Sequence, residues 1–235
     1  MRRIQLGVAV FVAIVISACQ TLPQVPYDRV AAGQPKSIAV LTPAARKEAN
    51  VVLATSVGQS FGLIGALIDA GMQSNRETEF AKFAAPKNFS GPDSLVRYTS
   101  EALTSAGYST SVGSVPRQDL NFLKVYPTST EVPGDAFLDI KMQYGYLAAG
   151  ISTPYRPFVF VECKLVKASD KSVLMQRTIA YNSLWPVPDQ GVTLAPDPVY
   201  EFKDFDALIA EPDKAVEGLD KAIAQVAGTI GTLVR

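Results

Sequence analysis

Three consecutive segments decide the fold: Phe137–Leu147 (FLDIKMQYGYL), Phe158–Lys167 (FVFVECKLVK) and Val173–Tyr181 (VLMQRTIAY). Apolar and polar residues alternate along each of them, and this period of two is typical of strands with one buried face. The predicted buried face comprises Leu138, Ile140, Met142, Tyr144, Tyr146, Val159, Val161, Cys163, Leu165, Val173, Met175, Ile179 and Tyr181. The short turn at 168–172 joins the last two segments into a hairpin. We therefore predict a three-stranded antiparallel meander.

The segments that flank the meander have helical patterns. Asp213–Val234 repeats apolar residues at every third or fourth position, which predicts a long amphipathic C-terminal helix. Pro92–Gly107 predicts a second helix, with Asp93 or Ser94 as its cap. Short β-rich runs at Lys36–Leu41 and Tyr108–Val112 extend the sheet. The predicted fold class is α+β: a mixed sheet that ends in the meander, with helices packed on one face.

Residues 44–89 are predicted to form a Gly-rich helical insertion. Within it, Val51–Met72 (VVLATSVGQSFGLIGALIDAGM) contains a single charge, at Asp69. As a helix, this run places its small residues on one face, namely Ala54, Gly58, Gly62 and Gly65. Three interpretations stay open: a buried helix packed on the core, a segment that associates with or inserts into a membrane, and a face for self-association.

The N-terminus has the organisation of a secretion signal. Arg2 and Arg3 precede the uncharged run Leu6–Ile16, which is too short to span a bilayer. The sequence Ile16–Cys19 (ISAC) then places an aliphatic and two small residues before a cysteine. We expect a signal peptide at 1–18, a lipidated N-terminus and tether at 19–35, and a single α+β periplasmic domain at 36–235.

Composition excludes several classes of function. The sequence has no His, which removes Ser-His and Cys-His catalysis and His-ligated zinc. Its 22 basic and 22 acidic side chains balance, and without Arg2 and Arg3 the mature chain has 22 − 2 = 20 basic ones, so nucleic-acid binding is not expected. With Cys19 lipidated, Cys163 has no partner in the chain and is predicted to be an inert core thiol.

No catalytic, cofactor-binding or metal-binding residue is predicted. Gly58, Gly62 and Gly65 lack the Lys-Ser/Thr that follows a phosphate-binding loop. We expect solvated charges at Asp139 and Glu162, on the polar faces of their strands. In the Pro-rich loop 182–203, Asp197, Tyr200 and Glu201 beside Trp185 are compatible with a polar and aromatic ligand cleft. The alternative is that Trp185 and Tyr200 pin the loop to the core.

Several of these motifs resemble a known family. The ISAC sequence resembles the lipobox of bacterial lipoproteins, in which the cysteine thiol receives a diacylglycerol and the signal is cleaved before it. Together with KSIAVL (36–41), GPDSLVRYTSEALTSAGY (91–108) and the meander, it is similar to proteobacterial envelope lipoproteins. Their domain resembles the N-terminal domain of the Tol-system protein TolB and the curli-secretion lipoprotein CsgG. GLIGALIDAG (62–71) and LAPDPVYEFKDFDAL (194–208) also look like segments of such lipoproteins.

The resemblance implies a membrane-anchored protein with Cys19 as the acylated residue. Gln20, in place of the Asp that retains enterobacterial lipoproteins in the inner membrane, favours the outer membrane and its periplasmic side. The first hypothesis is a non-enzymatic envelope lipoprotein that acts through contacts with envelope proteins. The alternative is an oligomeric, membrane-associated or pore-like secretion or assembly component that uses residues 51–72. A carboxylate-based hydrolase is the third, and homo-oligomerisation is left open.

Overall fold

The computed structural model describes residues 23–53, 70–84, 87–182, 184, 187 and 189–235. The predictions on Cys19, on the glycines between 58 and 65 and on Trp185 lie outside these residues.

The described residues form an eight-stranded mixed sheet. Its strands are β1 (Ser37–Leu41), β2 (Ala44–Ala45), β3 (Asn50–Leu53), β4 (Ser109–Gly113), β5 (Ala136–Ala148), β6 (Arg156–Lys167), β7 (Val173–Tyr181) and β8 (Val192–Leu194). The order is β4-β1-β5-β6-β7-β8, and β2 and β3 also pair with β5. The β5–β6 and β6–β7 pairs are antiparallel, which confirms the meander, while β1 pairs in parallel with both β4 and β5.

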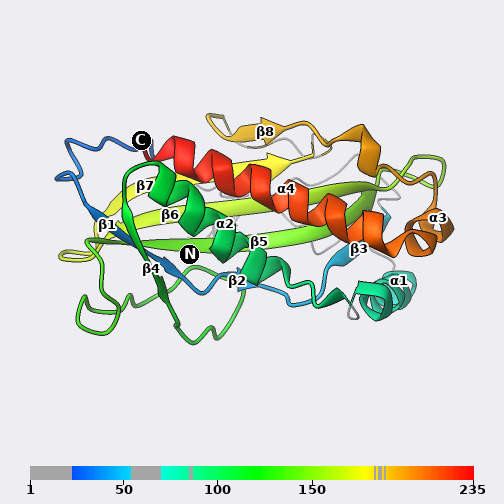
Figure 1. The fold of residues 1–235 in the computed structure, drawn as a ribbon, viewed down its shortest axis with the longest axis horizontal. Coiled ribbons are helices and arrows are strands. Elements are labelled where there is room, and N and C mark those ends of the chain that lie inside the picture. Colours follow the sequence, from blue (N-terminus) through cyan, green and yellow to red (C-terminus); the bar gives the residue numbers. More distant parts are fainter. Residues whose placement is uncertain (1–22, 54–69, 85–86, 183, 185–186, 188) are drawn as a thin grey trace, which may run out of the picture.

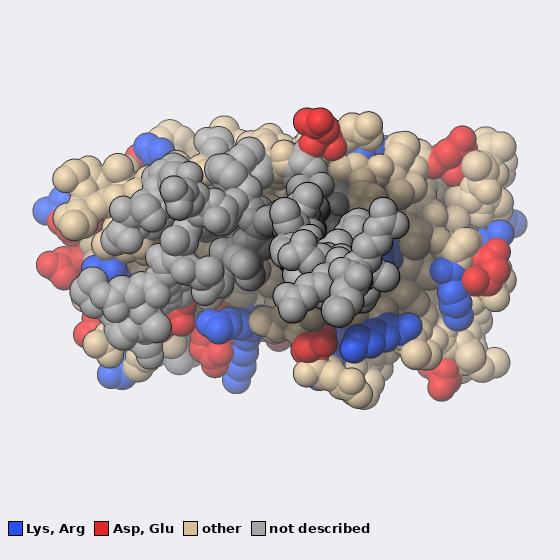
Figure 2. All heavy atoms as spheres, turned by 180° about the vertical axis from the view of Figure 1, so that it is seen from behind, with Lys and Arg blue, Asp and Glu red and all other residues tan. Residues whose placement is uncertain are grey.

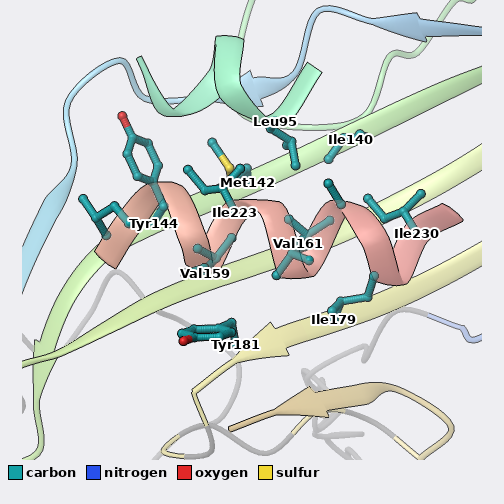
Figure 3. Packing of buried hydrophobic residues seen from close by; sticks show 14 of the residues in the cluster. Leu95, Ile140, Met142, Tyr144, Val159, Val161, Ile179, Tyr181, Ile223 and Ile230 are labelled. Atoms are coloured by element: carbon teal, nitrogen blue, oxygen red, sulfur yellow. The ribbon is translucent and has the colours of Figure 1, made fainter. Parts of the chain in front are cut away.

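Helices cover one face of this sheet (Figure 1). They are α1 (Ala70–Ala84), α2 (Gly91–Ser105), α3 (Phe205–Ala210) and α4 (Pro212–Leu233). The long helix α4 lies across the meander with α2 beside it, and Figure 3 shows Ile223 and Ile230 of α4 above Val161 of β6. All three side chains are 0% exposed, and burial of each such side chain contributes about 1.5–3 kcal/mol. The predicted α+β class, with helices on the sheet and a long C-terminal helix, is confirmed.

The register of the meander follows the predicted alternation, with one exception. The predicted face lies in the main core, from Leu138 on β5 to Tyr181 on β7. Val173 is the exception, at 42% exposed, because the β6–β7 register shifts between Leu165 and Val166. This irregularity turns the first residue of β7 out of the alternating pattern.

Helix α2 begins one residue earlier than predicted, and its cap is Ser90. The hydroxyl of Ser90 accepts a hydrogen bond from the backbone N–H of Asp93 at 3.4 Å, so the expected capping by Asp93 or Ser94 is wrong. The first helical residue is Gly91, which packs against the ring of Tyr144. A Cβ at position 91 would lie 2.5 Å from that ring, so only a glycine permits this approach.

The helical interpretation of residues 44–53 is wrong. Two short strands, β2 and β3, pair in parallel with β5 there, and Val51 is fully buried. Gly145 of β5 explains how β3 fits: its φ of +151° and its missing Cβ leave room for the backbone of Asn50, which a Cβ would meet at 1.8 Å. No helix in the described part of the chain is long and apolar enough to cross a membrane.

The described part of the predicted tether is folded onto the domain. Val25 forms an antiparallel bridge with Gln176 of β7, and Ala32 is 5% exposed. Residues from Pro23 onward therefore contact the sheet instead of forming a free, extended linker.

Candidate functional site

Cys19, the one predicted site residue, precedes the described part of the chain, so its lipidation stays a prediction. The fold begins close to it: Pro23, the first described residue, follows Cys19 by 23 − 19 = 4 positions.

Cys163 is the other cysteine, and it lies in the centre of the core. It is 0% exposed on β6, opposite Ile140 of β5 and Arg177 of β7. Burial raises the pKa of its thiol from 9.0 to about 12, because a thiolate in this apolar layer would be poorly solvated. The thiol is therefore protonated at neutral pH, as expected for a structural cysteine rather than a nucleophile.

The candidate functional site is a groove between the N-terminal halves of α2 and α4. Its cavity measures about 760 Å³, and Lys87, Asp93 and Arg97 lie on the α2 side of it. The α4 side contributes Asp213, Val216, Glu217 and Asp220. Counting the charged side chains among its lining residues gives two basic and four acidic groups, a net charge of 2 − 4 = −2.

The centre of this α2–α4 groove is a fixed carboxylate, Asp220. It accepts hydrogen bonds from Ser94 at 2.9 Å and from the hydroxyl of Tyr98, and the guanidinium of Arg97 lies 3.9 Å away. The hydrogen bond to Asp220 is the largest cause of a raised pKa for Tyr98. Arg97 also stacks over the Tyr98 ring, with its Cζ 3.9 Å from the ring centre. These contacts join α2 to α4 and fix the acidic group in place.

The other acidic groups of the groove are less confined. Glu217 accepts the hydroxyl of Tyr200 at 2.9 Å, which raises the pKa of that tyrosine. Asp213 pairs with Lys87, yet the Asp213 side chain remains 80% exposed. The groove thus combines exposed negative charge with apolar surface from Phe89 and Val216, a composition suited to a basic and partly apolar protein segment.

Asp139 is not solvated as the sequence pattern suggested. It is 0% exposed and lies under the loop 114–134, on the sheet face opposite α4. Arg117 donates to one of its oxygens at 2.7 Å, and the N–H of Leu123 and the hydroxyl of Tyr126 donate to the other at 2.8 and 3.1 Å. Burial, followed by the charge of Asp139, raises the pKa of Tyr126. Asp139 therefore anchors this loop.

Sequence reasoning missed this cluster for a physical reason. The segment 117–123 is irregular, and Arg117 also donates to the carbonyl oxygens of Thr42 and Asn121. The available signal was Phe137, an apolar residue two positions before Asp139 and therefore on the same face of the strand. Glu162 differs from Asp139, because it is partly exposed and pairs with Lys141 on the adjacent strand.

The polar set of the Pro-rich loop has structural roles. Asp197 caps the short 3-10 helix Pro198–Tyr200 by accepting the N–H of Val199, and Glu201 pairs with Arg156 at 2.6 Å. Tyr200 is 7% exposed and donates to Glu217. The contact of Tyr200 with α4 agrees with its predicted pinning role, whereas Asp197 and Glu201 bind their own turn and β6.

Basic and acidic side chains are mixed on the far side of the molecule. Figure 2 shows them interspersed across the described surface opposite α4. This mixture differs from the clustered basic face of a nucleic-acid-binding protein.

Comparison with known proteins finds fold similarity only. No protein-family model and no curated protein matches the chain. Among solved structures, the chain is similar to XCC0632 from Xanthomonas campestris, which is described by the family model DUF330. The two chains are 16% identical, the alignment covers 91% of this chain and 87% of XCC0632, and the TM-score is 0.41.

Two further structures are similar at the same level. PelC from Paraburkholderia phytofirmans, a dodecamer, has 13% identity, covers 87% and 94% of the two chains and gives a TM-score of 0.31. A homologue of neuraminyllactose-binding hemagglutinin from Helicobacter pylori has 13% identity, coverage of 90% and 89%, and a TM-score of 0.37. The similarity to the TolB N-terminal domain and to CsgG stays a prediction.

Proposed function

We propose that the chain is a bacterial envelope lipoprotein, anchored through Cys19 on the periplasmic side of the outer membrane. It acts through protein contacts and not by catalysis. The observation that carries this proposal is the N-terminal sequence, in which Arg2 and Arg3, the apolar run Leu6–Ile16 and the ISAC motif follow one another. Several acyl chains on one residue, at about 0.8 kcal/mol per buried methylene, hold a protein to a bilayer far more firmly than one chain.

The α2–α4 groove is the surface that we propose for these contacts. Its fixed carboxylate at Asp220 and its exposed one at Asp213 favour a partner segment that carries Lys or Arg. Phe89 and Val216 supply apolar area for the same segment.

The anchor is tested by metabolic labelling with palmitate. Cys19→Ser is expected to abolish the label and to leave unprocessed precursor, because serine lacks the sulfur atom that forms the thioether. Cys163→Ser is the matched control and retains the label, because Cys163 is buried in the core. Full labelling of the Cys19→Ser protein would show that the proposed anchor is incorrect.

The contact surface is tested by cross-linking in membranes of the native host. Asp213→Lys reverses a charge in the groove, and Asp189→Lys reverses an exposed charge elsewhere. The first variant is expected to lower the yield of cross-linked partner several-fold, while the second leaves it unchanged. Equal yields from both would exclude the groove. Native mass spectrometry of the same samples separates a second copy of the chain from a different protein.

A further inference from the structure

The first described residues of the chain close an edge of the sheet. We call residues 23–34 the N-terminal segment. Val25 donates to the carbonyl oxygen of Gln176 at 2.8 Å and accepts the N–H of Gln176 at 2.9 Å, and the Gln176 side chain donates to the carbonyl oxygen of Pro23 at 2.8 Å. These bonds occupy the part of the β7 edge that β8 leaves open, since β8 pairs with Ile179, Ala180 and Tyr181.

A side chain extends this pairing by one further step. The amide oxygen of Gln24 accepts the backbone N–H of Thr178 at 2.9 Å, and its amide nitrogen donates to the Thr178 hydroxyl at 3.0 Å. Gln24 therefore satisfies a strand N–H that a neighbouring backbone would otherwise bond. Thr178 and Gln176 are 1% and 6% exposed, so the bonds lie away from competing water.

The middle of the N-terminal segment is held near the C-terminus. The hydroxyl groups of Tyr27 and Tyr108 are 3.2 Å apart, and Tyr108 in turn donates to the carbonyl oxygen of Val234. Burial is the largest cause of a raised pKa for Tyr27. Asp28 closes the following turn by accepting the N–H groups of Val30 and Ala31. The segment is thus fixed at its start and at its middle.

We infer that the N-terminal segment holds the domain directly against a lipid surface, with the β7–β8 edge of the sheet toward the bilayer and β4 away from it. The inference rests on the proposed acylation of Cys19. Four residue steps from Cys19 to Pro23 span at most about 14 Å, even when fully extended. A domain on so short a connection cannot move away from the headgroups or tumble freely.

The orientation follows from where the connection leaves the fold. Pro23 lies on the β7 edge, and the layer of α2 and α4 separates it from any bilayer placed over the helical face. On the opposite face the loop 114–134 packs over Phe137 and Leu41 through Val115, Leu123 and Tyr126 and adds its own thickness. The sheet edge is therefore the part of the domain that the short connection brings closest to the bilayer.

The two sheet edges differ enough in position to be told apart. The order β4-β1-β5-β6-β7-β8 places five strand spacings between β4 and β8, about 24 Å. Thr193 on β8 and Val112 on β4 are both exposed, so each accepts a cysteine and a fluorophore. Cys163 does not compete for the label, because it is buried.

The experiment measures energy transfer from these two positions to lipids. Full-length acylated protein is reconstituted into vesicles of phosphatidylethanolamine and phosphatidylglycerol that carry a headgroup acceptor dye. Transfer from Thr193→Cys is expected to be roughly twofold higher than from Val112→Cys, because about 24 Å separates the edges. Insertion of about 20 Gly and Ser residues after Leu22, with a reach of roughly 25 Å, is expected to make the two values equal.

The attachment of the N-terminal segment to β7 is tested separately by hydrogen exchange. Val25→Pro removes the N–H that binds Gln176 and is expected to speed exchange at Gln176 and Thr178, whereas Val25→Ala keeps the N–H and the protection. Equal transfer from both edges in an acylated, vesicle-bound protein would overturn the orientation alone. Absence of acyl label on Cys19 would instead overturn the proposed function.

Discussion

At the scale of single residues, a buried ion pair has the largest structural consequence. Asp139 has no exposed surface and receives three donors, and the Arg117 side chain is 12% exposed. Removal of one member of such a pair leaves the other buried without its counter-charge. Replacement of both by apolar residues of similar size avoids that penalty.

Asp139→Ala is therefore expected to lower the free energy of unfolding by about 3–5 kcal/mol, as for other broken buried pairs. The double variant Arg117→Met/Asp139→Leu should recover only part of that loss, because the N–H of Leu123 and the hydroxyl of Tyr126 lose their acceptor as well. Glu162→Ala is the control, since the Lys141–Glu162 pair is partly exposed and worth about 1 kcal/mol or less. Urea unfolding measures all three, and similar losses for Asp139→Ala and Glu162→Ala would contradict a buried role for Asp139.

Cys163 gives a second prediction at this scale. Because burial raises the pKa of its thiol to about 12, we expect no alkylation by iodoacetamide in the folded protein at pH 8. Labelling of Cys163 should appear only with urea concentrations that unfold the core, and its midpoint should coincide with that of the tryptophan or far-UV signal. Rapid labelling without denaturant would show that the thiol is accessible.

At the scale of elements, how well the sequence predicts structure depends on the length of each helix or strand and on how close in sequence its partners lie. The meander strands and α4 were predictable because each repeats its period over nine residues or more, β7 being the shortest with 9. β2 and β3 have 2 and 4 residues, too few to distinguish a period of two from one of 3.6. The pairing of β3 with β5 depends on Gly145, far along the chain.

The same contrast holds for the candidate site. Sequence alone identified Asp197, Tyr200 and Glu201 as a group for a ligand cleft and allowed Tyr200 a pinning role instead. The α2–α4 groove went unpredicted, since Lys87 and Asp213 are distant in sequence and meet only once α2 and α4 pack on the sheet. The loop that buries Asp139 has no regular pattern to reveal it.

Two glycines of α4 provide a matched prediction. A Cβ at Gly231 would lie 2.8 Å from the Cβ of Ala102 and 3.0 Å from its carbonyl oxygen, so Gly231→Ala should force α2 and α4 apart and cost about 1–3 kcal/mol. A Cβ at Gly228 meets nothing within 4 Å. Gly228→Ala should stabilise the protein by about 0.5–1 kcal/mol through helix propensity. Thermal and urea unfolding of the two variants measure these changes. A gain of stability in both would contradict the close packing of Gly231 against Ala102.

At the scale of the whole molecule, the titrating groups predict the dependence of stability on pH. The sequence has no His, so stability should be flat from about pH 6 to 8. The backbone N–H of Lys36 donates a hydrogen bond to the Asp135 carboxylate and holds the pKa of that group low. The stability that this bond contributes is lost as the pH falls through and below about 4. Burial raises the pKa values of Tyr144 and Tyr146; the unfolded chain therefore releases these protons first, and stability falls above about pH 10.

Thermal unfolding at a series of pH values measures this profile. The melting temperature should form a plateau with a fall on either side. A change of several degrees between pH 6 and 8 would contradict it, because no imidazole is present to titrate there.

The bridge between Val25 and Gln176 also determines when the fold can be completed. It joins residues 176 − 25 = 151 positions apart, and β1, β2 and β3 all pair with β5, a strand from the middle of the chain. Contacts between such distant residues form slowly. In a chain that is translocated from its N-terminus, β1 can pair first with β4, whereas β2 and β3 stay unpaired until β5 has crossed. The edge that Val25 covers stays open until β7 follows. Folding is thus deferred by topology until most of the polypeptide has been delivered.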